Sequence, residues 1–161
     1  EDPSCPRCAN FELEVVPKLR SQFIDPGDMS LVFRGYPVVY DWGQPAVRAL
    51  EAAYDRSADA HWALAEHYFT EQDDFRFGDI SEVYPKTETF LADSTDVDAA
   101  AVVQAAENGD FDGAVQTDLD AGKAAGAKSI TPHLFLFREG VYQTKVTGYV
   151  GVDIIASALQ L

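Results

Sequence analysis

The two cysteines of the chain lie three positions apart, within the first ten residues, EDPSCPRCAN. Thiol groups at this spacing can form a small structural disulfide, supply half of a metal site, or act as a pair that exchanges disulfides with other molecules. The residues around Cys5 and Cys8, and the elements that position them, decide between these interpretations.

A structural disulfide and a metal site both fit the sequence less well than a redox pair. A disulfide between Cys5 and Cys8 would close a very small loop and remove little conformational entropy from the unfolded chain. A zinc ion would need two further ligands, and the chain offers only the histidines His61, His67 and His133. Because His61 and His67 are six residues apart, they face different sides of one predicted helix. We therefore interpret each histidine as an ordinary core or surface residue.

The position of the pair favours disulfide exchange, with Cys5 as the exposed attacking thiol and Cys8 as the resolving thiol. A helix that begins at Cys5 or Pro6 places Cys5 at its amino end, where free backbone N–H groups and the helix dipole stabilise a thiolate. Pro6 is tolerated at a first helical position, and Arg7 adds a nearby cation. We expect a pKa for Cys5 below the ~8.5 of a free cysteine. The backbone N–H groups are the expected main cause, because salt screens a solvated guanidinium.

A second element supports the redox interpretation. In SITPHLFLF, Pro132 stands at the start of a predicted strand and follows Thr131. A trans proline is common at a strand entrance. Together with the cysteine pair, however, the pattern predicts a cis Thr131–Pro132 bond, which turns the backbone of Thr131 toward the disulfide, where it can pair with an extended substrate.

The remaining pattern predicts a mixed α/β chain in which helices dominate the middle. Apolar residues four apart predict a first helix that kinks at Pro17, and DPGD predicts a turn. The residues from Met29 to Gly35 are rich in β-branched and aromatic types, which indicates a buried strand. Glu139 and Gly140 supply the turn of an antiparallel hairpin. The expected helices cover residues 9–23, 44–56, 59–72, 98–109, 111–126 and 153–161, the hairpin strands 132–138 and 141–147, and residues 73–90 receive no assignment.

The charge balance excludes several classes of partner. The chain has 161 residues, enough for a single globular domain, and 27 acidic against 12 basic residues give a net charge of −15. This charge argues against binding to nucleic acid or to an anionic membrane surface. The acids are spread along the chain, which favours the surface of a halophile protein that stays hydrated in concentrated salt. No apolar run reaches the ~18 residues of a membrane span, and no signal peptide is present.

The ordered set of motifs resembles a known family. The CPRC at a helix start, the proline nine residues after Cys8, the TP before a hairpin and the terminal helix resemble the thioredoxin fold. The segments LVFRGYPVVYDWGQPAVRALEAA and WALAEHYFTEQ are similar to DsbA-type thiol–disulfide oxidoreductases, in which a helical domain is inserted into that fold. With its acidic composition, the chain resembles a haloarchaeal member.

The resemblance implies a role for each site residue. Cys5 is the nucleophile, Cys8 its resolving partner, and Pro6 with Arg7 the dipeptide that tunes them. Thr131 and Pro132 are the residues that meet the substrate backbone, with Pro132 in the cis form.

The resemblance also implies a domain organisation, and the chain departs from the family pattern at its first strand. Residues 1–42 and 126–161 form the thioredoxin-like domain, and residues 43–125 the inserted helical region, with the helix near 111–125 assignable to either part. The family's first strand runs directly into the cysteine motif, whereas only Glu1–Ser4 precede Cys5 here, so we expect that strand to be missing or truncated. The family often carries a buried acid near the cysteines on that strand; the sequence identifies none, and Asp2 and Glu12 are merely the acids near the motif.

The sequence thus predicts a protein thiol–disulfide oxidoreductase with no metal or organic cofactor. Its partners would be protein thiols and disulfides and a separate redox partner, outside the cytoplasm, with membrane contact only through an N-terminal anchor. One alternative is a Cu(I)-binding or delivery module that uses Cys5 and Cys8, although Met29 is the only additional soft ligand. Another is an interaction domain whose cysteines are idle.

Overall fold

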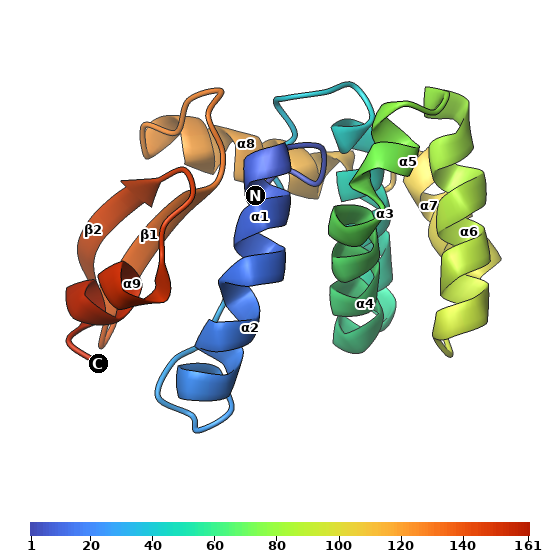
Figure 1. Ribbon diagram of the computed structural model, residues 1–161. Coiled ribbons are helices and arrows are strands. Elements are labelled where there is room, and N and C mark those ends of the chain that lie inside the picture. Colours follow the sequence, from blue (N-terminus) through green and yellow to red (C-terminus); the bar gives the residue numbers. More distant parts are fainter.

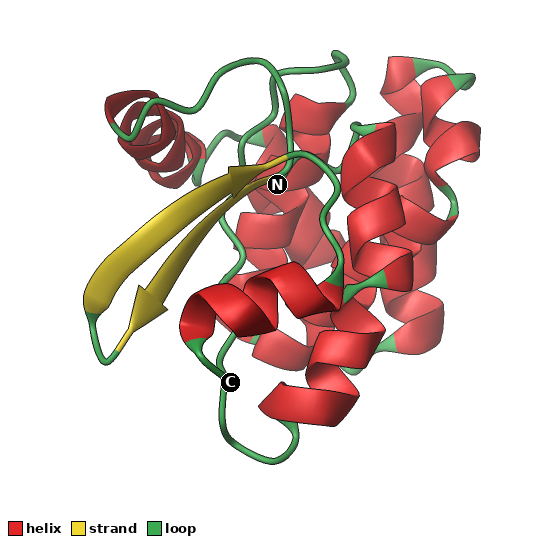
Figure 2. Cartoon of the chain, turned by 60° about the vertical axis from the view of Figure 1, so that its left-hand side comes forward, coloured by secondary structure: helices red, strands yellow, loops and turns green.

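A computed structural model describes all 161 residues of the chain. Figure 1 shows the β-hairpin and the last helix on one side, the first helices in the middle, and a bundle of helices on the other side. Figure 2 shows that the hairpin is strongly twisted and that the N-terminus lies near the end at which its first strand begins. The architecture is the α/β arrangement with an inserted group of helices that the sequence predicted.

The first helical segment is broken for one residue just before Pro17, at the place where the sequence predicted a kink in a continuous helix. α1 covers Pro6–Glu14, α2 covers Val16–Leu19, and a π-helical turn covers Arg20–Ile24. Pro17 has no backbone N–H, so it cannot donate the hydrogen bond that would join the two helices in regular geometry. The turn predicted after the segment is present and uses Gly27, whose φ of +90° suits glycine.

The buried strand predicted from Met29 to Gly35 is not formed. The segment has no regular secondary structure, because a strand requires a hydrogen-bonded neighbour and the backbone here pairs only with Glu1. The Glu1 amino group donates to the Arg34 carbonyl at 2.8 Å, and the Tyr36 N–H donates to the Glu1 carbonyl at 2.6 Å. A largely apolar groove of about 930 Å³ lies along this segment and β1.

The predicted hairpin is present as the only sheet. β1 (His133–Arg138) and β2 (Val141–Thr147) pair in antiparallel orientation and are joined by Glu139 and Gly140. Both turn residues have positive φ angles, 51° and 77°, which match the right-handed twist of a tight hairpin. α9 (Val152–Leu159) follows and packs on the sheet.

Helices fill the rest of the chain. The helices are α3 (Gly43–Arg56), α4 (Ala58–Thr70), α5 (Gln72–Arg76), α6 (Val83–Ser94), α7 (Ala99–Glu107) and α8 (Asp112–Ala124). Of these, α3, α4, α7 and α8 lie where the sequence predicted helices, whereas α5 and α6 were not predicted. The segment left without an assignment, residues 73–90, holds most of α5, a 3₁₀ turn (Ile80–Glu82) and the start of α6.

Two hydrophobic cores meet at α1, and this meeting positions the cysteines. Cys5, Cys8 and Ala9 belong to a core shared with the helical region, around α3, α4 and α6. Phe11 and Val15, further along α1, belong to a second core that includes residues of β1 and α9. α1 is therefore held on two sides, with its amino end at the junction. None of the helices combines the length and the apolarity that crossing a bilayer requires.

Candidate active site

Cys5 is the residue that caps the amino end of α1. Its backbone is extended (φ −87°, ψ 121°), and Pro6 occupies the first helical position, as the sequence predicted. The N–H groups of Cys8 and Ala9 donate to the Cys5 carbonyl at 3.0 and 3.1 Å, which closes the first turn. The Cys5 thiol therefore lies where the unpaired N–H groups of the helix point.

Both thiols are buried, and this corrects the expectation that Cys5 is exposed. The exposed fraction is 5% for Cys5 and 0% for Cys8, and both are free thiols in this structure. Cys5 is covered because the chain before β1 lies over it: its Sγ lies 3.5 Å from the Thr131 carbonyl oxygen, to which only the protonated thiol donates. The Thr131–Pro132 bond is cis. The structure thus brings together Cys5, Cys8 and Thr131, which are separated by more than 120 residues of sequence.

The surroundings lower the pKa of one thiol and raise that of the other. A hydrogen bond with the Cys8 thiol is the largest cause that lowers the pKa of Cys5, to about 5, against the opposing effect of burial. The N–H groups of Cys8 and Arg7 add smaller contributions in the same direction. Burial raises the pKa of Cys8, and its hydrogen bond to Cys5 adds to this effect. Cys5 is thus a thiolate at neutral pH while Cys8 keeps its proton.

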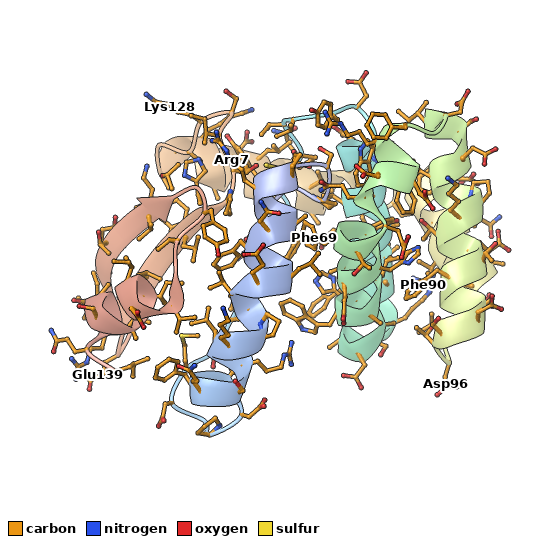
Figure 3. All side chains as sticks on the ribbon, in the orientation of Figure 1. Arg7, Phe69, Phe90, Asp96, Lys128 and Glu139 are labelled. Atoms are coloured by element: carbon orange, nitrogen blue, oxygen red, sulfur yellow. The ribbon has the colours of Figure 1, made fainter.

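This order of causes differs from the sequence prediction, which put the helix N–H groups first. The Cys8 thiol is the main hydrogen-bond donor to the Cys5 sulfur. Its effect depends on burial, which no local sequence pattern indicates. The Arg7 side chain is exposed and makes no hydrogen bond or ion pair. Figure 3 shows Arg7 at the amino end of α1, at the same end of the molecule as Lys128.

Asp2 is a buried acid beside the cysteines, which the sequence alone did not identify. It is completely buried, and its N–H donates to the Cys8 Sγ at 3.4 Å. Its carboxylate accepts hydrogen bonds from the N–H and Oγ of Ser4 at 2.8 and 2.6 Å. It also accepts from the N–H groups of Val38 and Val39, each at 2.8 Å. Asp2 therefore ties the residues before Cys5 to the loop that leads into α3.

Glu1 and Glu12 form a second pair of acidic residues near the amino end of the chain. Burial raises the pKa of Glu12 to about 8, and the charge of Glu1 adds to this effect. Burial also raises the pKa of Glu1. Glu12 is on α1, and its electrostatic interaction with Glu1, which precedes the helix, has no local sequence signal.

Each of the three histidines contacts its own structural neighbours, and the three do not form a common metal site. His61 is buried, and its Nδ1 lies 3.1 Å from the Leu50 carbonyl. The ring of His67 stacks on Phe90 with centroids 4.0 Å apart. His133 contacts Lys128 and Thr147 at the start of β1. No group of three or more His, Cys, Asp or Glu side chains is placed to share a metal ion.

The low pKa of Cys5 makes the stability of the reduced protein depend on pH. The Cys5 pKa is about 5 in the folded state against 9.0 for an unperturbed thiol, so the thiolate stabilises the fold fully above pH 9 and this contribution is lost as the pH falls through 5. We expect the free energy of unfolding of the reduced protein, relative to Cys5→Ala, to increase from pH 5 to pH 8.5. Urea unfolding of both proteins under reducing conditions measures this difference, and a pH-independent difference would contradict the assignment.

Comparison with known proteins gives a family and several relatives. The sequence model of the family described as Thioredoxin matches residues 1–145. The chain is 28% identical over 71 residues to a probable disulfide bond formation protein D of Bacillus cereus, and 30% identical over 73 residues to disulfide bond formation protein D of Bacillus subtilis. These alignments cover 44% and 45% of this chain and 33% of each relative. The matched part therefore spans about a third of the curated relatives' length.

Solved structures share the whole fold at low sequence identity. The crystal structure of Wolbachia pipientis alpha-DsbA1 superposes with a TM-score of 0.80 and 18% identity over 99% of this chain and 81% of the other. That of oxidised BdbD from Bacillus subtilis gives a TM-score of 0.71 and 18% identity over 99% of this chain and 84% of the other. The arrangement of hairpin, first helices and inserted bundle is thus common to these proteins.

Proposed function

The chain belongs to the thioredoxin family, and from this membership we propose that it is a protein thiol–disulfide oxidoreductase with Cys5 as nucleophile and Cys8 as resolving thiol. The observation that carries the proposal is the opposite shift of the two thiol pKa values, with Cys5 lowered to about 5 and Cys8 raised. Two idle thiols would not need such different surroundings, whereas exchange needs one thiolate and one proton-bearing partner.

In the oxidising direction, the pair starts as a disulfide. A substrate thiolate attacks the Sγ of Cys5, a bond forms between the substrate sulfur and Cys5, and the Cys5–Cys8 bond breaks. The electron pair stays on the Cys8 sulfur, which takes up a proton because its pKa is raised. A second substrate thiolate then attacks the substrate sulfur of the mixed disulfide and releases Cys5 as a thiolate. Two substrate thiols are oxidised and one protein disulfide is reduced.

The low pKa of Cys5 favours this last step, because a thiol of lower pKa is the better leaving group. Stabilising the reduced protein also makes the disulfide a stronger oxidant. In the reducing direction, the Cys5 thiolate attacks a substrate disulfide, and Cys8 loses its proton and resolves the mixed disulfide. Both directions use residues that the chain itself provides.

The neighbouring residues have supporting roles in this proposal. Pro6 and Arg7 tune the amino end of α1, and Thr131 with Pro132 meets the backbone of an extended substrate beside Cys5. The Thr131 carbonyl already lies 3.5 Å from the Cys5 Sγ, which supports this placement. Residues 1–42 and 126–161 would then carry the chemistry, and residues 43–125 would cover one side of it.

The proposal extends to location and partners. Disulfides persist outside the cytoplasm, so we place the protein there, acting on protein thiols or disulfides and renewed by a separate redox partner. The printed names of the Bacillus relatives, disulfide bond formation proteins, support this assignment. The net charge of −15 supports a protein that works in concentrated salt.

The reactivity of Cys5 against pH tests the proposal. We expect iodoacetamide to modify one cysteine of the reduced protein with a midpoint near pH 5, because only the thiolate reacts and the Cys5 pKa is about 5. Mass spectrometry of peptides identifies the modified residue, and denatured protein serves as the control with an ordinary midpoint. A midpoint near ~8.5 at Cys5, together with tight one-to-one Cu(I) binding, would support the metal-binding alternative instead.

A further inference from the structure

An exposed aromatic and cationic patch lies beside the amino end of α1. It consists of Tyr40, Arg76 and Phe77, and the exposed fractions of its two rings are 39% for Tyr40 and 77% for Phe77. Figure 1 shows that α5 and the loop entering α3, which carry these residues, lie at the same end of the molecule as the start of α1.

Two hydrogen bonds fix this patch to the residues that precede Cys5. The Tyr40 N–H donates to the Ser4 Oγ at 3.0 Å. Gln72, in the helix that ends at Arg76, donates from its Nε2 to the Pro3 carbonyl at 2.7 Å. Because Pro3 and Ser4 lead directly into the thiol, the patch has a defined position relative to the reacting sulfur.

The Arg76 guanidinium is held between the two aromatic rings and has no anionic partner. Its Cζ lies 5.0 Å from the Tyr40 ring centroid and 5.2 Å from that of Phe77, within the range of cation–π attraction. No hydrogen bond or ion pair engages the group, although Asp73 and Asp74 stand in the same helix. The five N–H donors of Arg76 are therefore available to an incoming group.

We propose that the Tyr40–Arg76–Phe77 patch binds a carboxylate side chain of the protein substrate, next to the cysteine that reacts with Cys5. A planar guanidinium pairs with a carboxylate through two parallel hydrogen bonds, and its contact with the rings orders it in advance. The exposed rings add apolar contact area around the ion pair. This inference rests on the proposed function and names a substrate feature that the exchange chemistry does not require.

The charge of the whole chain makes such a patch selective. With 27 acidic and 12 basic residues, most of the surface repels an acidic segment. At low salt, an acidic segment is attracted to exposed cations, which on this part of the molecule include Arg76 and Arg7, whereas in concentrated salt only a direct contact with the guanidinium remains effective. The register of an acidic segment would thus be fixed relative to Cys5.

Exchange with matched peptides tests this inference. One series carries a single cysteine and a glutamate that moves residue by residue along the peptide, and the matched series carries glutamine instead. We expect the oxidised protein to react with the best glutamate peptide about 5- to 10-fold faster than with its glutamine counterpart at about 0.05 M NaCl, and this ratio to fall at about 1 M. Arg76→Gln should bring the ratio to about 1, and Arg76→Lys should retain only part of it, because lysine cannot form the paired contact.

Lys18→Gln is the matched control, because it removes one exposed positive charge from α2, beyond the other end of α1, and should keep the ratio. A ratio near 1 for the wild-type protein, or one that survives in Arg76→Gln, would overturn the inference. Peptides with serine in place of cysteine measure the same preference as a binding affinity. If no peptide exchanges but the serine peptides keep the Arg76-dependent preference, the proposed function fails and the carboxylate site stands.

Discussion

Replacing Cys5 by serine is expected to reduce thiol–disulfide exchange with a protein substrate to the uncatalysed background. Cys5 is the only thiol whose pKa lies below neutral pH, at about 5, and a hydroxyl in its place does not ionise there. The remaining thiol, Cys8, cannot replace Cys5 as the nucleophile, because its raised pKa keeps it protonated. The two thiols act as a unit in one covalent mechanism, so the loss of Cys5 alone is enough to stop it. The rate of insulin disulfide reduction, measured with and without each variant, gives the result.

Cys8→Ser is the matched variant, with a different expected outcome. Cys5 can still attack or be attacked, but no second thiol resolves the mixed disulfide, so the covalent complex with substrate accumulates. Non-reducing electrophoresis and mass spectrometry would detect this complex, and a reducing agent should release it. If Cys5→Ser traps the complex and Cys8→Ser does not, the roles of the two thiols are reversed and the mechanism proposed here is wrong.

The features that sequence could predict are those set by neighbouring residues. The tight hairpin depends on Glu139 and Gly140, which both adopt positive φ angles. The interruption of the first helix depends on the missing N–H of Pro17, and the start of α1 on Pro6 at its first position. Each of these signals acts within one turn of the chain, so the sequence alone carries it.

The features that sequence missed depend on distant partners. Residues 29–35 have the composition of a buried strand, but a strand also needs hydrogen-bonding neighbours, and only Glu1 supplies them. The burial of Cys5 follows from the Thr131 carbonyl, 126 residues away in sequence. The hydrogen bonds to the Asp2 carboxylate join residues 2 and 4 to residues 38 and 39, which are distant in sequence, so no local sequence pattern predicts them. Such positions become evident only when the chain is folded.

Asp2→Ala is expected to destabilise the protein by about 3 kcal/mol, because it removes at once the acceptor of several buried or part-buried donors. The carboxylate of Asp2 accepts from the N–H groups of Ser4, Val38 and Val39, and the residue is completely buried. Without the carboxylate, the buried N–H of Ser4 and the part-buried N–H groups of Val38 and Val39 lose their acceptor. Urea unfolding of the reduced and oxidised proteins measures the loss.

Asp79→Ala is the matched control, since Asp79 makes the same local contacts at the surface. It accepts from the N–H and Oγ of Ser81 at 2.9 and 2.8 Å, as Asp2 does from Ser4, but water can replace it there. We expect Asp79→Ala to have a much smaller effect. Asp2→Asn, which keeps one acceptor oxygen, should fall between the two and provides a folded variant if Asp2→Ala does not fold. Equal losses for Asp2→Ala and Asp79→Ala would show that the local turn, and not the buried link to Val38 and Val39, holds the residues before Cys5 in place.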